Sequence, residues 1–583
     1  MGQDRQRQQS LRRHPGEQLM RRLAHIGAGL AILAQLALGT PALAQSARDA
    51  AGLASTALSA PTQSKHFART GGFSIVSRVK ADFGAGLGAT ATGGTFGMTQ
   101  RIAHTNLTGC ELTSVAPLFS HWAPAAGVES NTSQDLMIKV AIEPKGTVTD
   151  QATNPPLYVQ GRGLEVFTLS RRGSLIVDEV PVSVAAGATF YERTGVTTAT
   201  AASGTIPRSQ IARGGTAMWG ENTGEGANAN DSVLFNNVTN NTVAGYTSSL
   251  MLGRCVSGKI APSIIGIGDS ISVGSHDYIP NGLGWVARAL AGWPGGQLGI
   301  AGEKERDTLT ARGFMARMPI ARFATAILDE YGTNDINAAD SLATVKASIL
   351  ASALRFQRQG QAFIKATILP YTTSTNGWFD VAGQTVTGNE AVRAAVNSWL
   401  RDTSANGFVA QANAQVASIP SAGRAYVVDP AAGVEVDASG ALTLNGGFWM
   451  AAPGGILDSG TATGGSTSSV ISTAKAYGVN ALRGYVVHTT GGTAAGQICV
   501  VAYNTATVIT CSNSMPLSPD ATTTFRIYRG LAVDGLHPAT EGHARAAAAA
   551  KPAIDKIMSL PIGFNLDMPR LPANDNEAER LAA

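Results

Sequence analysis

Two kinds of hydrophobic pattern divide the chain, and the first is a short alternation. Between Phe73 and Cys255, stretches that alternate apolar and polar residues are interrupted by Gly, Asn and Pro, for example Leu136–Ile142, Leu164–Leu169 and Leu175–Val180. Such alternation with frequent turn residues is typical of strands in two packed antiparallel sheets. We therefore predict a β-sandwich over residues 66–258, without a helix of appreciable length.

The pattern changes at Ser263 to continuous apolar runs separated by helical periodicity. The apolar runs predict buried parallel strands at 264–267, 324–328, 362–369 and 425–429. Apolar positions at helical spacing predict helices over 284–290, 341–359, 389–400 and 540–559. Strands that alternate with helices predict a parallel sheet with helices on both faces, an α/β domain made of residues 259–432 and 531–562.

Residues 433–530 interrupt this α/β pattern. They are rich in Gly, Thr and Ser and contain short β-like runs, such as 485–488 and 522–528. We predict an inserted small β module that leaves and rejoins the α/β domain close to Asp534. A site built around Asp534 would have this module at its rim.

The first 44 residues have the pattern of an export signal. Arg21-Arg22 is followed by the apolar run 26–38 and by Ala42-Leu43-Ala44, which is the order of a signal peptide with its cleavage site. Met20 would be a more ordinary start. The arginine pair could signal twin-arginine export, but two arginines in a signal peptide are usually only its positive charge. The apolar run is too short for a membrane span. We predict a secreted or periplasmic protein, with a linker at 45–65 and a disordered tail at 563–583.

Charge and cysteine content narrow the function classes. The formal net charge is +4, but residues 1–44 account for all of this excess, so the remainder is neutral and predicts no nucleic-acid partner.

The four cysteines are an even number, which permits disulfides in an exported chain. Cys499 and Cys511 flank a hairpin-like stretch, and Cys110 with Cys255 would then close the N-terminal domain. A zinc site is disfavoured because neither C-x-x-C nor a neighbouring His accompanies them.

Ser270 lies in Gly268-Asp269-Ser270, directly after the predicted strand 264–267. The carboxyl ends of parallel strands are where α/β sheets place ligands, so Ser270 is a candidate nucleophile. Serine is also a common turn or capping residue, and that structural interpretation stays open for this motif alone.

Asn334 lies in Gly332-Thr333-Asn334-Asp335, which follows another predicted strand at the same edge of the sheet. A side-chain amide can donate a hydrogen bond to the oxyanion of an acyl-transfer reaction. The structural alternative is an Asx turn that leads into the next helix.

Asp534 and His537 precede the last predicted helix in Asp534-Gly535-Leu536-His537-Pro538. At this spacing on a loop the carboxylate can orient the imidazole, as in a serine-hydrolase triad. A structural turn with Pro538 at the helix start is the alternative.

Together these three motifs, in this order, resemble the nucleophile, G-x-N-D and D-x-x-H blocks of the SGNH (GDSL) hydrolase family. The resemblance implies a three-layer α/β/α hydrolase domain and a serine esterase. It implies Ser270 as nucleophile, His537 as general base, Asp534 as its orienting partner, and Asn334 as an oxyanion donor beside the Ser270 amide. No metal or other cofactor is expected.

The family's other oxyanion donor is a glycine after the second strand, and Gly302 matches it best. The Asn that often precedes this glycine is missing, so Gly299 is the alternative. The chain also lacks the second glycine of the G-x-S-x-G elbow of ordinary α/β-hydrolases. His276 follows Ser270 closely and could face the cleft, although a surface turn is the favoured interpretation, and we interpret His543 as structural.

The expected substrate is a carboxylic ester. Flanking β modules in an exported enzyme favour an acylated carbohydrate polymer, whereas a lipase or thioesterase of the same family is the nearest alternative. From another class, a non-catalytic surface or phage-tail-like binding protein would explain the Gly/Thr/Ser-rich β sequence. Retention of Ser270, Asn334, Asp534 and His537 favours the enzyme.

Overall fold

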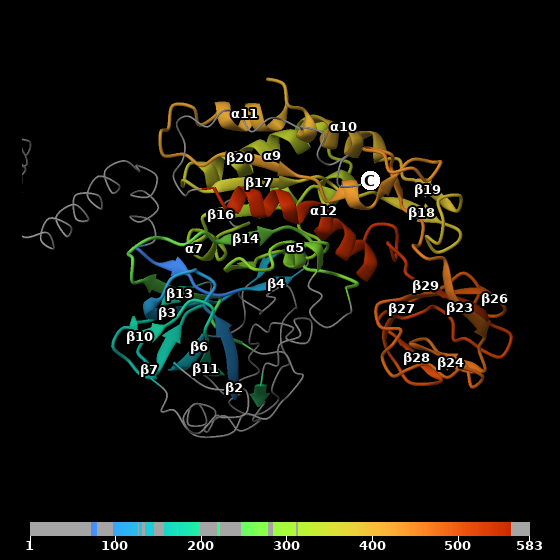
Figure 1. Cartoon of the computed structure of the whole chain (residues 1–583), viewed down its shortest axis with the longest axis horizontal. Coiled ribbons are helices and arrows are strands. Elements are labelled where there is room, and N and C mark those ends of the chain that lie inside the picture. The colour runs from blue at the N-terminus through green and yellow to red at the C-terminus, as the bar shows by residue number, and fades with distance from the viewer. Residues whose placement is uncertain are drawn as a thin grey trace, which may run out of the picture. The chain divides into compact units, whose positions relative to one another are not determined.

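The computed structural model describes residues 71–78, 97–125, 127–130, 135–144, 157–171, 173–198, 219–221, 246–277, 284–310 and 313–560 (Figure 1). The predicted signal peptide (1–44), the linker (45–65) and the C-terminal tail (563–583) lie outside these residues. Contacts divide the chain into Met1–Ser64 and Lys65–Ala583, so every described residue belongs to the second unit.

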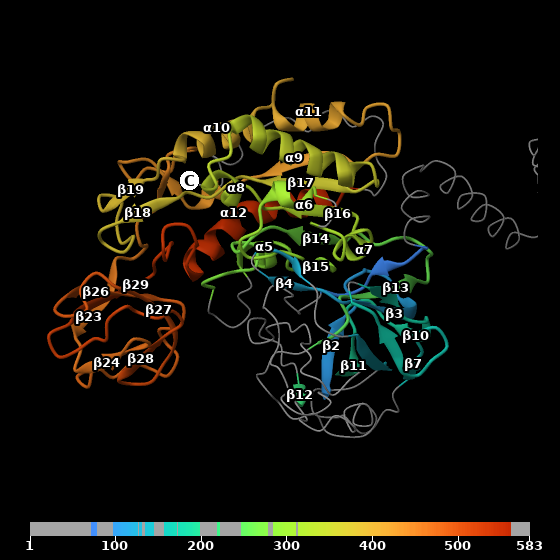
Figure 2. The same ribbon diagram turned by 180° about the vertical axis from the view of Figure 1, so that it is seen from behind.

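The N-terminal β region, residues 71–258, contains two antiparallel sheets. The first has the order β1-β13-β3-β10 with β9 also paired to β3, and these strands are β1 (Ser74–Ile75), β3 (Leu112–Ser120), β9 (Ser174–Ile176), β10 (Val180–Val184) and β13 (Leu250–Cys255). The second has the order β12-β2-β11-β6-β7 with β8 also paired to β6, and its strands are β2 (Gly97–Thr105), β6 (Leu136–Glu143), β7 (Leu157–Val159), β8 (Phe167–Leu169), β11 (Thr189–Thr198) and β12 (Trp219–Glu221). Figure 2 shows β2 and β11 side by side.

Apolar residues of both sheets form one buried cluster, which includes Leu112, Phe119, Ile138, Ile142 and Phe190. The described residues of this region contain no α-helix. Its strand content agrees with the alternating pattern of the sequence, and the β-sandwich itself stays a prediction. A short hairpin, β4 (Ala123–Ala125) with β5 (Val128–Ser130), lies outside both sheets.

The parallel sheet predicted from the apolar runs is confirmed. Its strand order is β15-β14-β16-β17-β20, and its strands are β14 (Ile264–Ile267), β15 (Gly295–Gln297), β16 (Ala326–Asp329), β17 (Ala362–Ala366) and β20 (Ala425–Val428). After β14 the chain adds β15 on one side of it and then β16 on the other side. At such a switch of direction, a ligand is expected in the crevice at the carboxyl ends of the strands.

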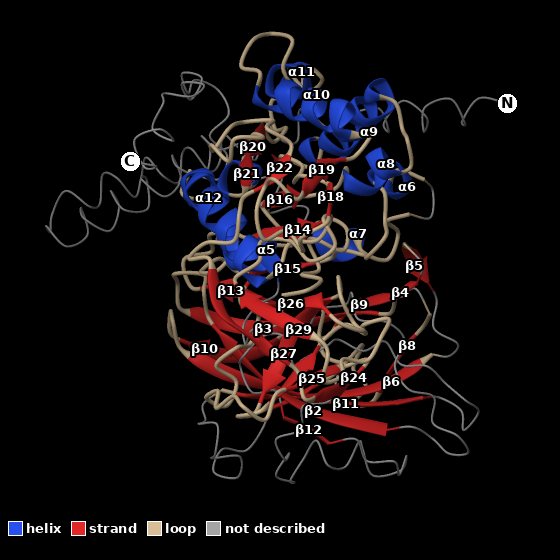
Figure 3. Cartoon of the chain, turned by 90° about the vertical axis from the view of Figure 1, so that its right-hand side faces the viewer, coloured by secondary structure: helices blue, strands red, loops and turns tan. Residues whose placement is uncertain are grey.

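Alternate residues of these strands face two different cores. Ile265, Ile267 and Phe363 pack with one group of helices, which comprises α7 (Met318–Ala321), α9 (Leu342–Gln357), α10 (Glu390–Arg401) and α11 (Phe408–Ala414). Ile264 and Ile364 pack with α5 (Gly284–Ala289) and α12 (Thr540–Met558). Figure 3 shows α5 and α12 on one side of the strands and α9 and α10 on the other.

Helix ends agree closely with the sequence pattern. The Ser341 side chain accepts a hydrogen bond from the Thr344 amide at 3.2 Å, which caps α9 at its first turn. Two short helices, α6 (Glu305–Thr308) and α8 (Thr333–Asn337), follow β15 and β16, and the 3-10 helix η3 (Ala431–Gly433) follows β20.

The region predicted as an insert is made of antiparallel strands. A hairpin of β21 (Glu435–Val436) and β22 (Phe448–Trp449) comes first. A sheet of order β23-β29-β26-β27-β28-β25-β24 follows, with β23 (Ile456–Thr461), β24 (Gly464–Ser466), β25 (Ser469–Ile471), β26 (Val486–Gly491), β27 (Ile498–Asn504), β28 (Val508–Cys511) and β29 (Thr524–Tyr528). The module has its own buried cluster, built around Val487, Val501 and Ile527.

Two disulfides tie the β regions, Cys110–Cys255 and Cys499–Cys511. These are the two pairings considered from the sequence. In the part of the chain that the structure describes, none of the helices combines the length and apolar character needed to cross a bilayer.

Candidate active site

The three sequence motifs meet at the carboxyl edge of the parallel sheet. Ser270 lies in the loop that follows β14, and Asn334 is the second residue of α8 after β16. Asp534 and His537 lie in the loop before α12. Because parallel strands end at the same edge, motifs far apart in the sequence are brought together here.

Ser270, His537 and Asp534 form a continuous hydrogen-bonded chain. The Ser270 Oγ lies 2.8 Å from His537 Nε2, and His537 Nδ1 lies 2.7 Å from Asp534 Oδ2. With Nδ1–H donating to the carboxylate, Nε2 is left to accept the serine hydroxyl. Both distances are within the hydrogen-bond range required of a nucleophile and its base.

The other carboxylate oxygen of Asp534 is also held. The backbone amides of His537 and Leu536 donate to Oδ1 at 2.8 and 3.0 Å. The loop therefore fixes the carboxylate through its own backbone, and the carboxylate in turn fixes the imidazole ring.

The pKa values of this pair are shifted in opposite directions. Although burial favours the protonated acid, the pKa of Asp534 falls to about 2 because the His537 imidazole hydrogen-bonds to it and interacts with its charge. Burial lowers the pKa of His537, but the hydrogen bond and charge of Asp534 outweigh it, so the net pKa lies above the ordinary 6.5. A raised pKa makes the imidazole a stronger base for the serine proton once the ring is neutral.

Asn334 links two loops of the site through its side-chain amide. Its Nδ2 donates to the Glu303 carbonyl at 3.0 Å and to Asp269 Oδ2 at 3.2 Å. It thereby connects the loop after β15 with the loop that carries Ser270. To donate to an oxyanion, this amide would share or exchange one of these two bonds.

Gly302 directly precedes Glu303 and adopts φ +82°, a conformation that favours glycine. Among the described residues, the amide nitrogens of Ser270 and Gly302 donate no backbone hydrogen bond. Gly299 differs, because a Cβ built there would lie 2.2 Å from the Ser272 Oγ. That contact explains its glycine by close packing, so Gly302 remains the better candidate for the oxyanion donor.

A group of buried acids lies beneath the site. Burial raises the pKa of Asp269 to about 6, although the Ile271 amide stabilises its carboxylate at 2.9 Å. Burial also raises the pKa of Glu330 well above its ordinary value, and the amide of Asp269 donates to its Oε2 at 3.3 Å. The carboxyl that contacts Asn334 therefore belongs to a low-dielectric layer rather than to solvent.

The loop that carries Asp534 and His537 is clamped at Gly535. The Trp449 indole donates to the Gly535 carbonyl at 2.8 Å, and the Thr372 amide donates to it at 3.2 Å. A Cβ on Gly535 would lie 1.7 Å from the Thr372 carbonyl oxygen, which explains the glycine. Trp449 belongs to β22 of the insert, whereas Thr372 begins the hairpin of β18 (Thr372–Ser374) and β19 (Gln384–Val386), which the sequence pattern did not predict.

Two further histidines lie close to the site. His276 Nε2 is 4.0 Å from Asp534 Oδ2, and its ring meets that of His537 edge-on, so the less favoured alternative, in which His276 faces the site, describes its position better than a surface turn. His543 is buried, its Nδ1 accepts from the Trp285 amide at 3.0 Å, and burial lowers its pKa to about 4. The structural role expected for His543 agrees with these contacts.

His276, Asp534 and His537 each place one ligand atom within 4.8 Å of the others, a spacing at which they could hold a metal ion. No motif of the sequence indicates this group, because His276 is far from the other two residues along the chain. The hydrogen bond between Asp534 and His537 already occupies His537 Nδ1 and Asp534 Oδ2.

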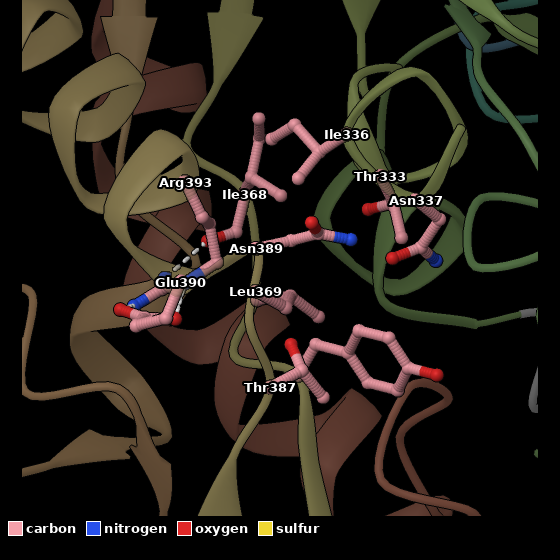
Figure 4. A pocket seen from close by; sticks show the side chains of 10 residues that line it. Thr333, Ile336, Asn337, Ile368, Leu369, Thr387, Asn389, Glu390 and Arg393 are labelled. Atoms are coloured by element: carbon pink, nitrogen blue, oxygen red, sulfur yellow. Dashed lines mark hydrogen bonds and ion pairs between the residues drawn. The ribbon is translucent and has the colours of Figure 1, made fainter. Parts of the chain in front are cut away.

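A pocket adjoins the short helix that carries Asn334 (Figure 4). Thr333, Ile336 and Asn337 share one face of α8 and line one wall. The remaining lining residues are Ile368, Leu369, Tyr371, Thr387, Asn389, Glu390 and Arg393. Figure 4 shows Glu390 and Arg393 on the opposite side of the pocket from Thr333 and Asn337, joined by an ion pair with a shortest N–O distance of 2.6 Å.

No protein-family model matches the sequence, and no curated protein matches it. Solved structures that align with it include a GDSL-like lipase from Bacteroides thetaiotaomicron (13% identity, 32% of this chain and 80% of that chain, TM-score 0.21). The salicylyl-acyltransferase SsfX3 from a tetracycline biosynthetic pathway aligns over 81% of this chain and 85% of its own (10% identity, TM-score 0.26). A mutant of an acetyl-xylooligosaccharide esterase from Geobacillus aligns over 30% and 77% (15% identity, TM-score 0.20). Similarities of this size show no activity for this chain.

Proposed function

We propose that this protein is a serine esterase that hydrolyses carboxylic esters through an acyl-enzyme. The observation that carries the proposal is the hydrogen-bonded chain from Ser270 through His537 to Asp534, with distances of 2.8 and 2.7 Å. The SGNH-type assignment of the hydrolase domain and the domain boundaries predicted from the sequence belong to the same proposal.

In the first step the Ser270 Oγ attacks the ester carbonyl carbon while His537 Nε2 takes the hydroxyl proton. Asp534 stabilises the imidazolium that forms. The tetrahedral oxyanion accepts hydrogen bonds from the amides of Ser270 and Gly302 and from the Asn334 side chain. When the intermediate collapses, His537 protonates the departing alcohol.

In the second step a water molecule attacks the acyl-enzyme and gives its proton to His537. The carbonyl carbon again becomes tetrahedral, and the same three donors face its oxygen. Collapse breaks the bond to Ser270 Oγ, which recovers its proton from His537, and releases the carboxylic acid. Every step uses groups of this chain together with water.

For the substrate, we propose short acyl esters of a carbohydrate. Among its apolar residues the pocket beside Asn334 carries the polar side chains of Asn337, Thr387 and Asn389, which are the proposed contacts for sugar hydroxyls. Secretion or periplasmic residence is part of this proposal, and the two disulfides support an oxidising compartment.

The test is hydrolysis of p-nitrophenyl acetate, butyrate and octanoate by the purified protein and by Ser270→Ala. We expect Ser270→Ala to lose about 10⁴-fold or more of kcat, because removing a triad nucleophile abolishes the acyl-enzyme route. Ser275→Ala, in the same loop, is the matched control and should retain activity. Preference for octanoate would favour a lipase, and absence of activity above Ser270→Ala on these esters and on acetylated polysaccharides would favour a binding protein.

A further inference from the structure

The β4–β5 hairpin of the N-terminal β region reaches the loop that carries Gly302. A Cβ built on Gly127, at the turn of this hairpin, would lie 2.7 Å from the Gly302 carbonyl oxygen and 3.0 Å from its carbonyl carbon. The two backbones are therefore in direct contact, and the hairpin leaves no space for a side chain between them.

Glu129, in β5, extends the contact through hydrogen bonds. Its Oε2 accepts from the Ala316 amide at 2.9 Å, and its Oε1 accepts from Arg317 Nε at 2.7 Å. Ser120 also donates to the Ala316 carbonyl at 3.0 Å. Hydrogen bonds from the N-terminal β region therefore fix the amide and the carbonyl of Ala316 and the side chain of Arg317.

Arg317 passes this connection to the loop. Its guanidinium is fully buried and donates to both carboxylate oxygens of Glu303, at 2.7 and 2.6 Å. It also donates to the Leu298 carbonyl at 2.9 Å, at the start of the same loop. A planar guanidinium with fixed donors can set the position of two segments at once, which a lysine could not do.

Glu303 is placed at the centre of the oxyanion donors. It directly follows Gly302, its carbonyl accepts from Asn334 Nδ2 at 3.0 Å, and its carboxylate accepts from the buried Tyr331 hydroxyl. A displacement of Glu303 would move the Gly302 amide and release Asn334 together.

A buried ion pair adds little net stability when compared with well-packed apolar residues, so stability alone is a weak reason for this chain of charges. Its fixed geometry is a stronger one. We propose that Glu129 and Arg317 are positioning residues through which the N-terminal β region holds the Gly302 amide and Asn334 in register with Ser270. This rests on the proposed function, because it assigns a task to the same oxyanion site.

The kinetic arm of the test compares Glu129→Gln and Gly127→Ala with the wild-type protein and with Glu179→Gln. Glu179 pairs with Arg254 in the same β region but is partly exposed and does not contact Glu129, Arg317 or Glu303, so Glu179→Gln should retain activity. We expect kcat to fall about 10- to 100-fold in both test variants with KM within about threefold, because misplaced oxyanion donors weaken transition-state binding. The ratio of ester to thionoester hydrolysis should fall as well, since sulfur gains less from those donors.

The second arm measures deuterium uptake of residues 298–305 by mass spectrometry and requires no catalysis. We expect faster uptake in Glu129→Gln and Gly127→Ala than in Glu179→Gln. Unchanged uptake in both variants, or faster uptake with an unchanged kcat, would overturn the positioning role. If the wild-type protein hydrolyses no ester while uptake still rises, the proposed function fails but the structural coupling stands.

Discussion

The N-terminal β region and the inserted β module are both antiparallel, yet they join the parallel-sheet core in different ways. Leu118, Trp122 and Leu252 of the first region belong to the same buried cluster as Ile265 and Leu298. The seven-stranded sheet of the insert has a separate core, whereas Trp449 of the preceding β21–β22 hairpin packs in the cluster of α5 and α12. This sheet contacts the rest of the chain through a small apolar cluster and through hydrogen bonds, including the one that the Tyr528 hydroxyl donates to the Gly377 carbonyl at 2.6 Å.

The two attachments also serve different parts of the candidate site. The N-terminal region is linked through Glu129 and Arg317 to the loop of Gly302, the residue proposed as an oxyanion donor. The insert contacts the loop of Asp534 and His537 through the Trp449 indole. The difference suggests that one β region fixes the groups that would stabilise charge, whereas the other fixes the groups that would move protons.

The largest expected effect is on stability at the N-terminal attachment. Arg317→Met leaves Glu129 and Glu303 buried without their cation and should cost about 3–5 kcal/mol. Tyr528→Phe at the insert removes one hydrogen bond and should cost about 1–2 kcal/mol. Urea unfolding of both variants measures the difference, with Arg545→Met in the partly exposed pair with Glu541 as control. Equal costs for Arg317→Met and Tyr528→Phe would remove the contrast between the attachments.

The two disulfides sharpen the same contrast. Cys110–Cys255 spans 145 residues, whereas Cys499–Cys511 spans 12. Loop-closure entropy grows with the logarithm of loop length, so replacing the first pair by serine should destabilise the protein by ~2 kcal/mol more than replacing the second. Thermal unfolding of the two double variants checks this. A larger loss for Cys499→Ser/Cys511→Ser would mean that the insert, and not the N-terminal region, supports the fold.

A smaller effect is expected in catalysis when the insert's clamp is removed. Trp449→Phe deletes the indole donor to Gly535, a hydrogen bond worth roughly 1 kcal/mol, and should lower kcat about fivefold to tenfold. Steady-state hydrolysis of p-nitrophenyl acetate measures this fall in kcat. The control is Trp399→Phe, because Trp399 lies in α10 on the opposite face of the parallel sheet. An unchanged kcat would show that the Asp534–His537 loop holds its geometry without the insert.

The sequence predicted the parallel sheet and the motifs of the candidate site, but not the contacts that hold these motifs in place. The reason is physical. Ser270, Asn334 and His537 each follow a strand or precede a helix, and the parallel order brings such positions to one edge. Glu129 and Arg317 are separated by 188 residues, and neither lies in a motif. Their pairing depends on a long-range contact that no local periodicity encodes. The same holds for Trp449 at Gly535 and for His276 beside Asp534.

The smallest effect, a shift in pH dependence, separates the two attachments most sharply. His537 must be neutral to accept the Ser270 proton, and its pKa lies above 6.5 because of Asp534, so wild-type kcat/KM should rise with pH through a midpoint above 6.5. Trp449→Phe loosens the Asp534 loop and should move this midpoint down by less than about one unit. Glu129→Gln acts on the oxyanion side and should leave it in place while kcat falls.

The stability of this pair must follow the same signs. The contribution of His537 is present below pH 6.5 and is lost as pH rises through its higher folded pKa. The contribution of Asp534 is present above its ordinary pKa of 3.8 and is lost as pH falls towards about 2. Unfolding at pH 5 and pH 9, compared between wild type and His537→Gln, isolates the first contribution.

Equal midpoint shifts of kcat/KM in Trp449→Phe and Glu129→Gln would show that both attachments act on one loop, and the division between charge stabilisation and proton transfer would be wrong.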